Sequence, residues 1–292
     1  MIMRETQVAA AIANLARMGL GEDECAVIIK RWLEFNNSFS VAAACRGAVA
    51  NSKLIPVGLP EDCSGQLFMS CHFGPYVYIP AYLGLRTPSR RVSVMIGEES
   101  DGLKSALSAF GKSLDVSVSF ISGGIGIAKA LKKALAAGDP VFVAIDIPWG
   151  AKSSLNREFA FVNGTIQSKD ALFRLARSAD APTNFLLASA TNDDIMLTNY
   201  GERTQEECFA IFSHIARNSL HQYERLFQLH HFTTNENSSG VAVTWRGAKD
   251  RYILNSGDMK VYAVGGSLFD TVPSKAEVEA ITGEAVEYVA AF

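Results

Sequence analysis

The chain lacks the features that mark several large classes of protein. Its five cysteines are irregularly spaced and contain no C-x-x-C pair, so neither a disulfide framework nor a cysteine-rich metal site is expected. Its formal net charge is only −3, which gives no reason to expect binding to nucleic acid or to an anionic membrane surface. No uncharged apolar run is long enough to cross a bilayer, and no signal peptide is evident. These absences predict a cytoplasmic protein with reduced thiols, no transmembrane segment and no metal.

Three common motifs of catalysis or nucleotide binding are also missing. The chain has no G-x-S-x-G nucleophile elbow and no G-x-x-x-x-G-K-[ST] phosphate loop. Its glycine-rich segment, Ser122-Gly123-Gly124-Ile-Gly126, differs from G-x-G-x-x-G and follows the third predicted strand rather than the first. This segment is interpreted either as a plain tight turn or as an anion site, because backbone N–H groups between a strand and a helix can bind negative charge.

The strongest positive signal is the stretch from Gln66 to Tyr82, in which a buried strand is predicted to end at His72. Gly74 and Pro75 interrupt the strand, and proline is well tolerated in the first turn of the helix that should follow. A histidine at such a turn lies at the carboxyl end of a sheet, where open α/β sheets bind their ligands. His72 is therefore the leading catalytic candidate, although a structural histidine fits the same pattern.

A second candidate is Asp146, which ends the apolar strand predicted over Val141–Asp146. Burial of a carboxylate is costly unless the group is paired or faces a cleft. Asp146 is therefore expected either to orient His72 or to anchor a loop. Cys71 neighbours His72 in the chain, but adjacent strand residues point to opposite faces of a sheet, so a Cys71–His72 nucleophile pair is disfavoured.

The order of predicted elements indicates an α/β fold with a largely parallel central sheet flanked by helices. Strands that are separated by helices of this length require crossover connections, which join parallel strands. The expected strands are Gln66–Cys71, Arg91–Ile96, Val116–Ile121, Val141–Asp146 and Asn184–Ser189, and the expected helices are Pro75–Leu85, Asp101–Gly111, Ile125–Ala137 and Lys169–Ala179. Glu158–Phe161 and Ile195–Asn199 are expected to be short additional strands, for both of which an antiparallel position at an edge of the sheet is considered.

Helices are predicted on the N-terminal side of this core. Residues 3–18 and 23–35 have helical patterns, and Ser38 is predicted to cap a third helix that runs to about Ala50. Residues 51–65 contain two prolines and two glycines and are expected to be irregular. Further along, one long helix is predicted from Thr204 to His230, with Thr204 and Glu207 forming a capping box.

The C-terminal part is expected to be a small α+β add-on packed on the core. The polar residues 235–240 are the candidate linker. Short strands are predicted at 241–245, 252–254 and 260–264, followed by a helix from Ser274 to Ala290. The expected organisation is thus an N-terminal helical lead-in (1–50), an α/β core (51–238) and the add-on (239–292), within a chain long enough for a sizeable core.

Several short motifs follow one another in a recognisable order between residues 60 and 235. They are Cys-His72-Phe-Gly, a helix ending at Gly138, Asp146-Ile-Pro-Trp-Gly, Phe159-Ala-Phe161-Val-Asn-Gly-Thr, Ala171-Leu-Phe-Arg-Leu-Ala176 and Tyr223…Leu229-His-His-Phe232. In this order and spacing the chain resembles the lauroyl/myristoyl acyltransferase family of lipid A biosynthesis, within the lysophospholipid-acyltransferase-like superfamily. Each motif is short, so the resemblance depends on the whole series.

The resemblance implies acyl transfer from a thioester of coenzyme A, an acyl carrier protein or a peptidyl carrier protein to a small-molecule hydroxyl or amine. No tightly bound cofactor is implied. His72 matches the catalytic histidine of the family and would act as general base on the acceptor. The residues expected to bind substrate are Gly74, Tyr76, Ser122, Gly123 and Gly124.

The chain departs from the family in two respects. The acid that follows the histidine by five positions in the family is Val77 here. Asp146 is the best candidate to replace it, with Glu98 or Glu99 behind it; otherwise His72 acts alone, or the chemistry is lost or changed. The membrane anchor of the lipid A enzymes is missing, which favours a soluble or carrier-bound acceptor, as in specialised-metabolite biosynthesis.

Two alternatives to an acyltransferase stay open. One is a non-catalytic protein that binds an acyl chain or a carrier protein, which Val77 favours. The other is an enzyme for thioester hydrolysis or condensation.

Overall fold

The computed structural model describes residues 5–39, 53–97, 101–124, 126–147, 156–191, 194–231, 233–234, 241–246, 251–256, 259–264, 272–283 and 288–291. By its internal contacts the chain divides into two compact units. One comprises Met1–Leu33, Val162–Thr165 and Arg225–Phe292, and the other comprises Glu34–Phe161 and Ile166–Glu224. These boundaries differ from those that we expected after residues 50 and 238.

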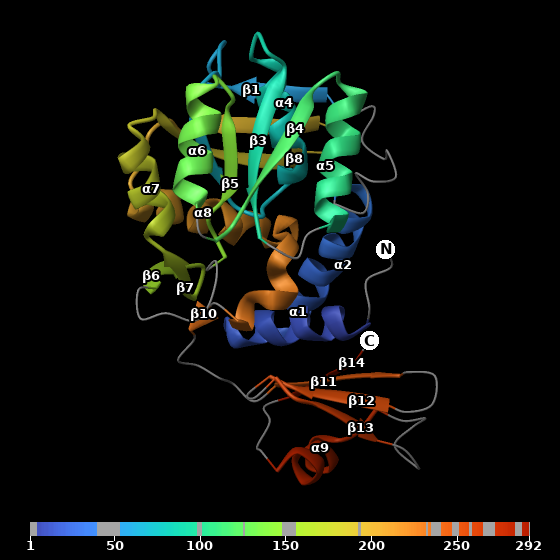
Figure 1. Ribbon diagram of the computed structural model, residues 1–292. Coiled ribbons are helices and arrows are strands. Elements are labelled where there is room, and N and C mark those ends of the chain that lie inside the picture. The colour runs from blue at the N-terminus through green and yellow to red at the C-terminus, as the bar shows by residue number, and fades with distance from the viewer. Residues whose placement is uncertain are drawn as a thin grey trace. The chain divides into compact units, whose positions relative to one another are not determined.

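The larger unit is built on a seven-stranded sheet with the strand order β1-β9-β8-β2-β5-β3-β4. Figure 1 shows its strands β5, β3 and β4 side by side. The strands are β1 (Lys53–Val57), β2 (Leu67–Ser70), β3 (Arg91–Ile96), β4 (Ser117–Ser122), β5 (Val141–Ala144), β8 (Thr183–Thr191) and β9 (Asp194–Asn199). Neighbouring strands are parallel except β8 and β9, which are antiparallel. The predicted α/β class and its five main strands are confirmed. β9 is antiparallel to β8 as anticipated, but β1 rather than β9 forms the edge of the sheet.

Helices connect the parallel strands on both faces of this sheet. They are η1 (Tyr76–Tyr78) and α4 (Ile79–Leu85) after β2, α5 (Asp101–Ser113) after β3, α6 (Ile127–Ala136) after β4 and α7 (Ala171–Ala179) before β8. α8 (Gln205–Ser219) follows β9, the last strand of this sheet in the chain. The chain passes from β2 to β3 and β4 in one direction across the sheet and returns from β4 to β5 in the other. Because such crossovers are right-handed, α4 and α5 cover one face and α6 covers the opposite face.

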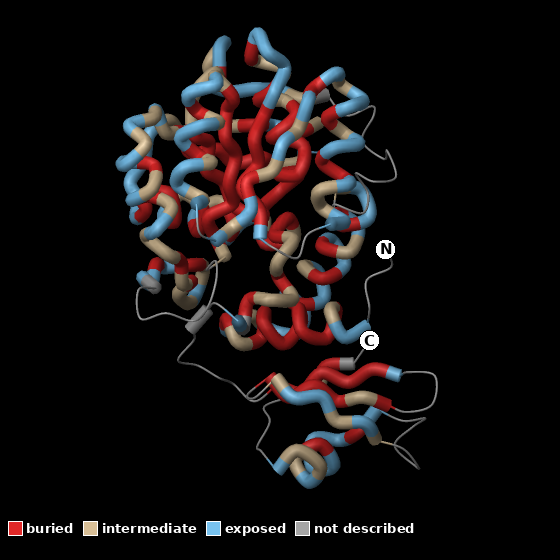
Figure 2. Tube along the Cα trace, in the orientation of Figure 1, coloured by how far each residue is buried: buried red, intermediate tan, exposed pale blue. Residues whose placement is uncertain are grey.

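The core of the larger unit lies between the sheet and the helices α4 and α5. Phe68 and Phe142 of the central strands pack there with Val94 of β3 and Leu83 of α4. Every residue of β2 and β5 is buried, whereas most of the edge strand β4 is exposed or half-buried (Figure 2). Burial on both faces explains why β2 and β5 are continuous apolar runs in the sequence instead of alternating patterns.

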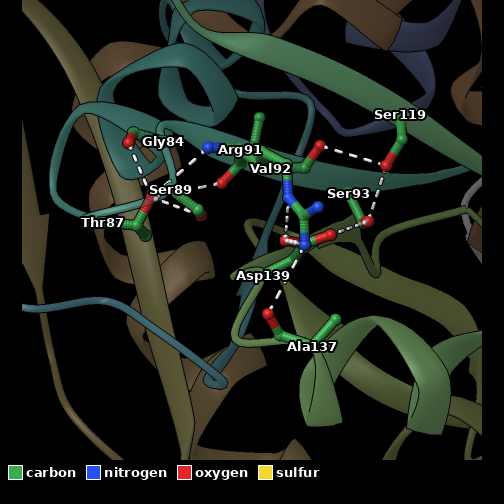
Figure 3. A network of polar contacts seen from close by, with 9 residues as sticks. All are labelled: Gly84, Thr87, Ser89, Arg91, Val92, Ser93, Ser119, Ala137 and Asp139. Atoms are coloured by element: carbon green, nitrogen blue, oxygen red, sulfur yellow. Dashed lines mark hydrogen bonds and ion pairs between the residues drawn. The ribbon is translucent and has the colours of Figure 1, made fainter.

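A polar network joins the amino ends of β3 and β5 (Figure 3). The Nε of Arg91 donates a hydrogen bond of 2.9 Å to Oδ1 of Asp139, and a terminal nitrogen of Arg91 lies 2.8 Å from the same oxygen. Ser93 Oγ donates to the other carboxylate oxygen of Asp139 at 3.5 Å and lies 2.7 Å from Ser119 Oγ. Asp139 is nearly buried, and these partners satisfy its charge at the edge of the sheet that lies opposite the carboxyl ends of the strands.

Three short segments differ from the sequence-based expectation. Residues 53–57 form β1 instead of an irregular stretch, and Pro56 is tolerated because β1 is an edge strand that pairs on one side only. Ser38 lies inside α2 (Glu22–Phe39) and does not cap a new helix, while residues 40–50 lie outside the described residues. β6 (Asn156–Phe161) was expected from residue 158, but β7 (Gly164–Lys169) was not predicted.

The helix predicted from Thr204 to His230 ends at Ser219. Its capping box is present, since Thr204 Oγ1 accepts from the N–H of Glu207 at 3.3 Å. Two 3₁₀ segments follow, η2 (Leu220–Gln222) and η3 (Glu224–His231), and Tyr223 between them is extended with ψ 106°. The prediction of one continuous helix was wrong because the chain at Tyr223 pairs with the segment after β2, a partner that is distant in the sequence.

The smaller unit contains a four-stranded sheet with the order β13-β12-β11-β14. Besides residues 22–33 of α2 and 225–231 of η3, its described elements include α1 (Glu5–Arg17), β10 (Thr233–Thr234), β11 (Val241–Arg246), β12 (Arg251–Asn255), β13 (Val261–Val264), α9 (Lys275–Thr282) and β14 (Tyr288–Ala291). α1 packs against β11 and β12, and the Arg17 guanidinium donates to the backbone carbonyl of Ser256 at 3.0 Å. The apolar residues of α1 from Val8 to Ala16 are buried.

The last helix is shorter than we predicted. α9 begins at the expected capping box of Ser274 and Glu277, but it ends at Thr282 because Gly283 adopts the left-handed conformation with φ 74°. Tyr288–Ala291 form β14 and pair parallel with β11, so the helix does not continue to Ala290 as predicted. None of the helices in the described parts of the chain combines the length and apolar character that crossing a membrane requires.

Candidate active site

His72 and Asp146 follow the carboxyl ends of two neighbouring strands. β2 and β5 are parallel neighbours in which Ser70 is the register partner of Ala144. Each of the two candidates comes two residues after its strand, so both lie at the same edge of the sheet. The connections that follow β2 and β5 run in opposite directions across the sheet. Such a topological switch point is where open α/β sheets bind their ligands.

The imidazole of His72 and the carboxylate of Asp146 form a hydrogen-bonded pair. The Nδ1 atom of His72 lies 2.8 Å from Oδ1 of Asp146, and the same oxygen accepts the backbone N–H of His72 at 3.0 Å. The other carboxylate oxygen, Oδ2, accepts the hydroxyl hydrogen of Tyr223 at 2.9 Å. Asp146 and Tyr223 are fully buried, and the His72 side chain is 10% exposed. Both oxygens of the buried carboxylate are therefore satisfied.

Opposing effects act on the pKa of Asp146. Burial by itself would raise this pKa, but attraction to the His72 imidazolium and the hydrogen bonds from the His72 ring, Tyr223 and the His72 backbone together lower it below its ordinary value. Asp146 is thus a carboxylate at neutral pH and can only accept hydrogen bonds. In a neutral His72 ring the proton must then reside on Nδ1, which leaves the lone pair of Nε2 as the base.

The His72 ring also contacts an aromatic side chain. The Tyr76 ring meets the His72 ring edge-on, with centroids 4.9 Å apart and an interplanar angle of 69°. Val77, the middle residue of η1, is buried in the apolar core. A carboxylate at position 77 would lie in apolar surroundings, and the acid that accompanies the histidine comes from the end of β5 instead.

A short segment around Tyr223 is joined to the segment that carries His72. Phe73 and Tyr223 form an isolated antiparallel bridge. The N–H of Gly74 donates to the carbonyl of Gln222, and the N–H of Glu224 donates to the carbonyl of His72 at 3.0 Å. The side-chain amide of Gln222 also bonds to both backbone groups of Ala190 in β8. These contacts fix the Tyr223 hydroxyl beside Asp146.

The structure brings together only some of the residues that we predicted to bind substrate. Tyr76 lies against His72. Gly74 has φ +61°, and a Cβ there would come within 1.8 Å of the Ala188 carbonyl oxygen, so glycine is required for packing. Its N–H is already bonded to Gln222.

The glycine-rich turn lies at the same edge of the sheet but farther along it. Ser122 ends β4, and Gly123 and Gly124 follow it; β4 is three strand spacings from β2 in the strand order. At about 4.8 Å per spacing the separation is roughly 14 Å. Glu98 and Glu99, the reserve candidates for the missing acid, lie outside the described residues.

Cys71 does not provide a nucleophile. It is fully buried, and burial, followed by the charge of Asp146 and the neighbouring Cys208, raises its pKa well above the ordinary value. A thiol in these surroundings stays protonated at working pH and is shielded from reagents.

Tyr223 is the site residue that sequence reasoning missed. It was interpreted as part of a packed helix, and no glycine or proline between Ser219 and Tyr223 signals that the helix ends there. Its role depends on tertiary contacts that leave no local pattern.

Metal ligands and known relatives give no further guide to this site. Within the described ranges, no three His, Cys, Asp or Glu side chains are grouped so that they could hold a metal ion. No model of a known protein family matches the chain, and no curated protein is significantly similar to it. The acyltransferase resemblance therefore depends on the order of short motifs and stays a prediction.

Proposed function

We propose that the protein is an acyltransferase that moves an acyl group from a carrier-protein or coenzyme A thioester to a hydroxyl or amine acceptor. The observation that carries this proposal is the hydrogen bond between Nδ1 of His72 and the buried carboxylate of Asp146 at the carboxyl edge of the sheet. This arrangement fits a histidine that takes a proton through its second ring nitrogen. The motif order described above supplies the reaction class.

In the proposed reaction Nε2 of His72 accepts the proton of the acceptor O–H or N–H as that oxygen or nitrogen attacks the thioester carbonyl carbon. The new C–O or C–N bond forms, and the tetrahedral intermediate collapses with cleavage of the C–S bond. The imidazolium then returns its proton to the departing thiolate, which leaves as a free thiol. Asp146 stabilises the imidazolium and keeps the ring oriented without itself taking up the proton. General-base help of this kind contributes roughly 10²–10⁴ in rate.

Two further features support the proposal. Asp146 supplies the carboxylate that Val77 cannot, so the departure from the family pattern does not leave His72 without an acid. The pair also lies at the switch point of the sheet. Tyr76 beside the ring and the turn at Ser122–Gly124 remain our candidates for substrate contacts. We place the reaction in specialised-metabolite biosynthesis, with an acyl or peptidyl carrier protein as the partner that delivers the donor.

One observation favours a second candidate function. The His72 side chain is only 10% exposed, which suits a non-catalytic protein that binds an acyl chain or a carrier protein through an inherited fold. Thioester hydrolysis or condensation by the same pair is the third candidate, since water or a carbon nucleophile can replace the acceptor.

A product analysis distinguishes these candidates. The protein is incubated with acyl-coenzyme A and with acylated carrier protein, each with and without a panel of small hydroxyl and amine acceptors. Thiol release is followed with a chromogenic disulfide, and products are identified by mass. Acylated acceptor together with stoichiometric thiol supports transfer, whereas free acid indicates hydrolysis. Retention of the intact thioester on the protein, with no thiol release for any acceptor, would contradict the enzyme proposal and support binding.

A further inference from the structure

The third partner of the His72–Asp146 pair has a role beyond packing. We infer that Tyr223 is a positioning residue whose hydroxyl fixes the Asp146 carboxylate, so that His72 is held as the Nδ1–H tautomer with Nε2 directed away from the acid. The expected effect on turnover depends on the proposed function. The expected effect on the tautomer of the His72 ring does not, and it can be tested without any substrate.

The two carboxylate oxygens of Asp146 have different partners. Oδ1 accepts from both the ring Nδ1 and the backbone N–H of His72, whereas Oδ2 accepts from the Tyr223 hydroxyl. A carboxylate can rotate about its Cβ–Cγ bond and exchange its oxygens unless both are held. Because Asp146 is fully buried, solvent cannot take over the place of the hydroxyl. The Tyr223 hydroxyl therefore holds Oδ1 in line with the His72 ring.

Tyr223 is itself fixed in place. Its ring packs against Phe161 and Phe212, with centroid distances of 5.7 Å and 5.5 Å. Its backbone forms the bridge to Phe73, and its N–H donates to the carbonyl of Leu220 at 3.0 Å. The next residue, Glu224, donates its N–H to the carbonyl of His72. His72 and Tyr223 are thus connected twice, once through the backbone and once through the carboxylate.

The hydrogen bond from the Tyr223 hydroxyl also weakens the attraction between the Asp146 carboxylate and the His72 ring. Without this hydrogen bond, Asp146 would attract the His72 ring more strongly and favour the imidazolium. The other titratable side chains that contact or neighbour the pair in the described structure are Cys71, Tyr76 and Glu224. Burial keeps Cys71 neutral throughout the relevant range. Loss of the hydroxyl is therefore expected to move the acid limb of the rate profile to higher pH.

The test compares Tyr223→Phe with Tyr200→Phe. Both changes remove one hydroxyl, but Tyr200 follows β9, and its side chain hydrogen-bonds to Thr198, away from the pair. Histidine is labelled with ¹⁵N, and the ring shifts of His72 are recorded at a pH at which the ring is neutral. We expect a single Nδ1–H tautomer in the unchanged protein and in Tyr200→Phe. In Tyr223→Phe the carboxylate can turn about its Cβ–Cγ bond and leave the neutral ring without an aligned acceptor, whereas the imidazolium still attracts it, so we expect a mixture of tautomers in the neutral ring.

Turnover gives the second readout. In Tyr223→Phe we expect kcat to fall roughly ten- to hundredfold, as when an outer partner of an essential side chain is lost, with KM unchanged and the acid limb moved to higher pH. A purely structural role would lower the fraction of active protein without moving the limb. Incorporation of 3-fluorotyrosine keeps the hydroxyl and makes it a stronger hydrogen-bond donor, so the acid limb of the pH–rate profile should move to lower pH. This second variant tests the inference even if Tyr223→Phe does not fold.

An unchanged tautomer in folded Tyr223→Phe, or an acid limb that stays in place in both altered proteins, would overturn the inference. The two readouts separate its failure from that of the proposed function. If no acyl transfer is found but the tautomer responds as expected, the proposed function fails and the positioning role stands. If transfer is found and the tautomer is unaffected, the positioning role fails alone.

Discussion

The Nδ1 atom of His72 lies 2.8 Å from Oδ1 of Asp146, although 74 residues separate the two in the chain. The register of β2 and β5 produces this proximity, because Ser70 is paired with Ala144 and each candidate follows two residues later. A slip of one residue in this pairing would turn the side chains to the opposite face. The buried apolar residues of both strands oppose such a slip, so the geometry of the pair is set by the most protected part of the fold.

The first prediction concerns His72 as the base. His72→Asn should abolish acyl transfer, by roughly 10²-fold or more, because an amide can reproduce the donor at Nδ1 but has no basic nitrogen in place of Nε2. His214→Asn is the matched control, since His214 is an exposed histidine of α8. Steady-state rates and circular dichroism of both variants check the prediction. Full turnover by folded His72→Asn would remove His72 from the mechanism.

The second prediction concerns Asp146 as the partner of His72. Asp146→Asn should lower kcat on the order of 10³-fold or more, because an amide can donate to Nδ1 and stabilise the wrong tautomer of the ring. KM for the thioester should change little, since Asp146 is fully buried and does not contact substrate. Separate determination of kcat and KM gives the answer. A rate equal to that of the unchanged protein would mean that the partner acid is elsewhere.

The third prediction concerns the stability of the protein in acid. The pKa of Asp146 is lowered on folding, so its ionised form stabilises the folded state at any pH above the unfolded-state pKa of about 3.9. This stabilisation is lost as the pH falls from there through the folded-state pKa. The difference in free energy of unfolding between the unchanged protein and Asp146→Asn should therefore be present at about pH 5 and shrink below about pH 4. Urea titrations from about pH 5 downward measure it; a difference that grows as the pH falls below about 4 would show that the sign is wrong.

The fourth prediction concerns the close approach of Gly74 to β8. Gly74→Ala should destabilise the protein by about 3 kcal/mol or more, because the added Cβ would meet the Ala188 carbonyl oxygen and the backbone has φ +61°. Gly138→Ala is the matched control, since Gly138 has φ +79° but no atom within 4 Å of an added Cβ, and it should cost only about 1 kcal/mol. Chemical denaturation of both variants provides the comparison. Equal losses would show that the backbone conformation, not the contact with β8, requires glycine at position 74.

The fifth prediction concerns the amino edge of the sheet. Asp139→Asn should cost about 1–2 kcal/mol of stability, since Asp139 is nearly buried and bonded to Arg91 and Ser93. Asp115→Asn should change stability by less than about 0.5 kcal/mol, because the Asp115 side chain is 94% exposed and lies 3.8 Å from Arg90. Neither change should alter turnover, since both residues precede their strands. Reduced kcat in folded Asp139→Asn would show that the two edges of the sheet are coupled.

The parallel strands and the pairing of His72 with Asp146 could be anticipated from the sequence for one physical reason. A strand that is buried on both faces appears in the sequence as an apolar run that ends abruptly. A buried polar residue at that end must form a hydrogen bond or an ion pair. The runs before His72 and Asp146 have this character, and parallel strands deliver their carboxyl ends to one edge. The candidate acid could therefore be named although Val77 occupies the position at which the family has one.

Other parts of the fold depend on tertiary partners and leave no local pattern. The end of α8 is set by backbone bonds to His72 and Gly74, so the helical pattern that continues to His230 was misleading. β1 forms in spite of Pro56 because β9 offers a pairing edge. β14 forms because β11 offers a pairing edge to residues whose sequence pattern predicts a helix. In each case the deciding hydrogen bonds come from a segment that is remote in the chain.

The packing of α1 against β11 and β12 has a consequence for biosynthesis. α1 leaves the ribosome with an apolar surface from Val8 to Ala16 whose covering strands are synthesised more than 220 residues later. Until then this surface needs a chaperone or risks self-association. Nascent chains arrested before Val241 should therefore be insoluble or chaperone-bound, and the smaller unit can assemble only after β11 and β12 have been synthesised.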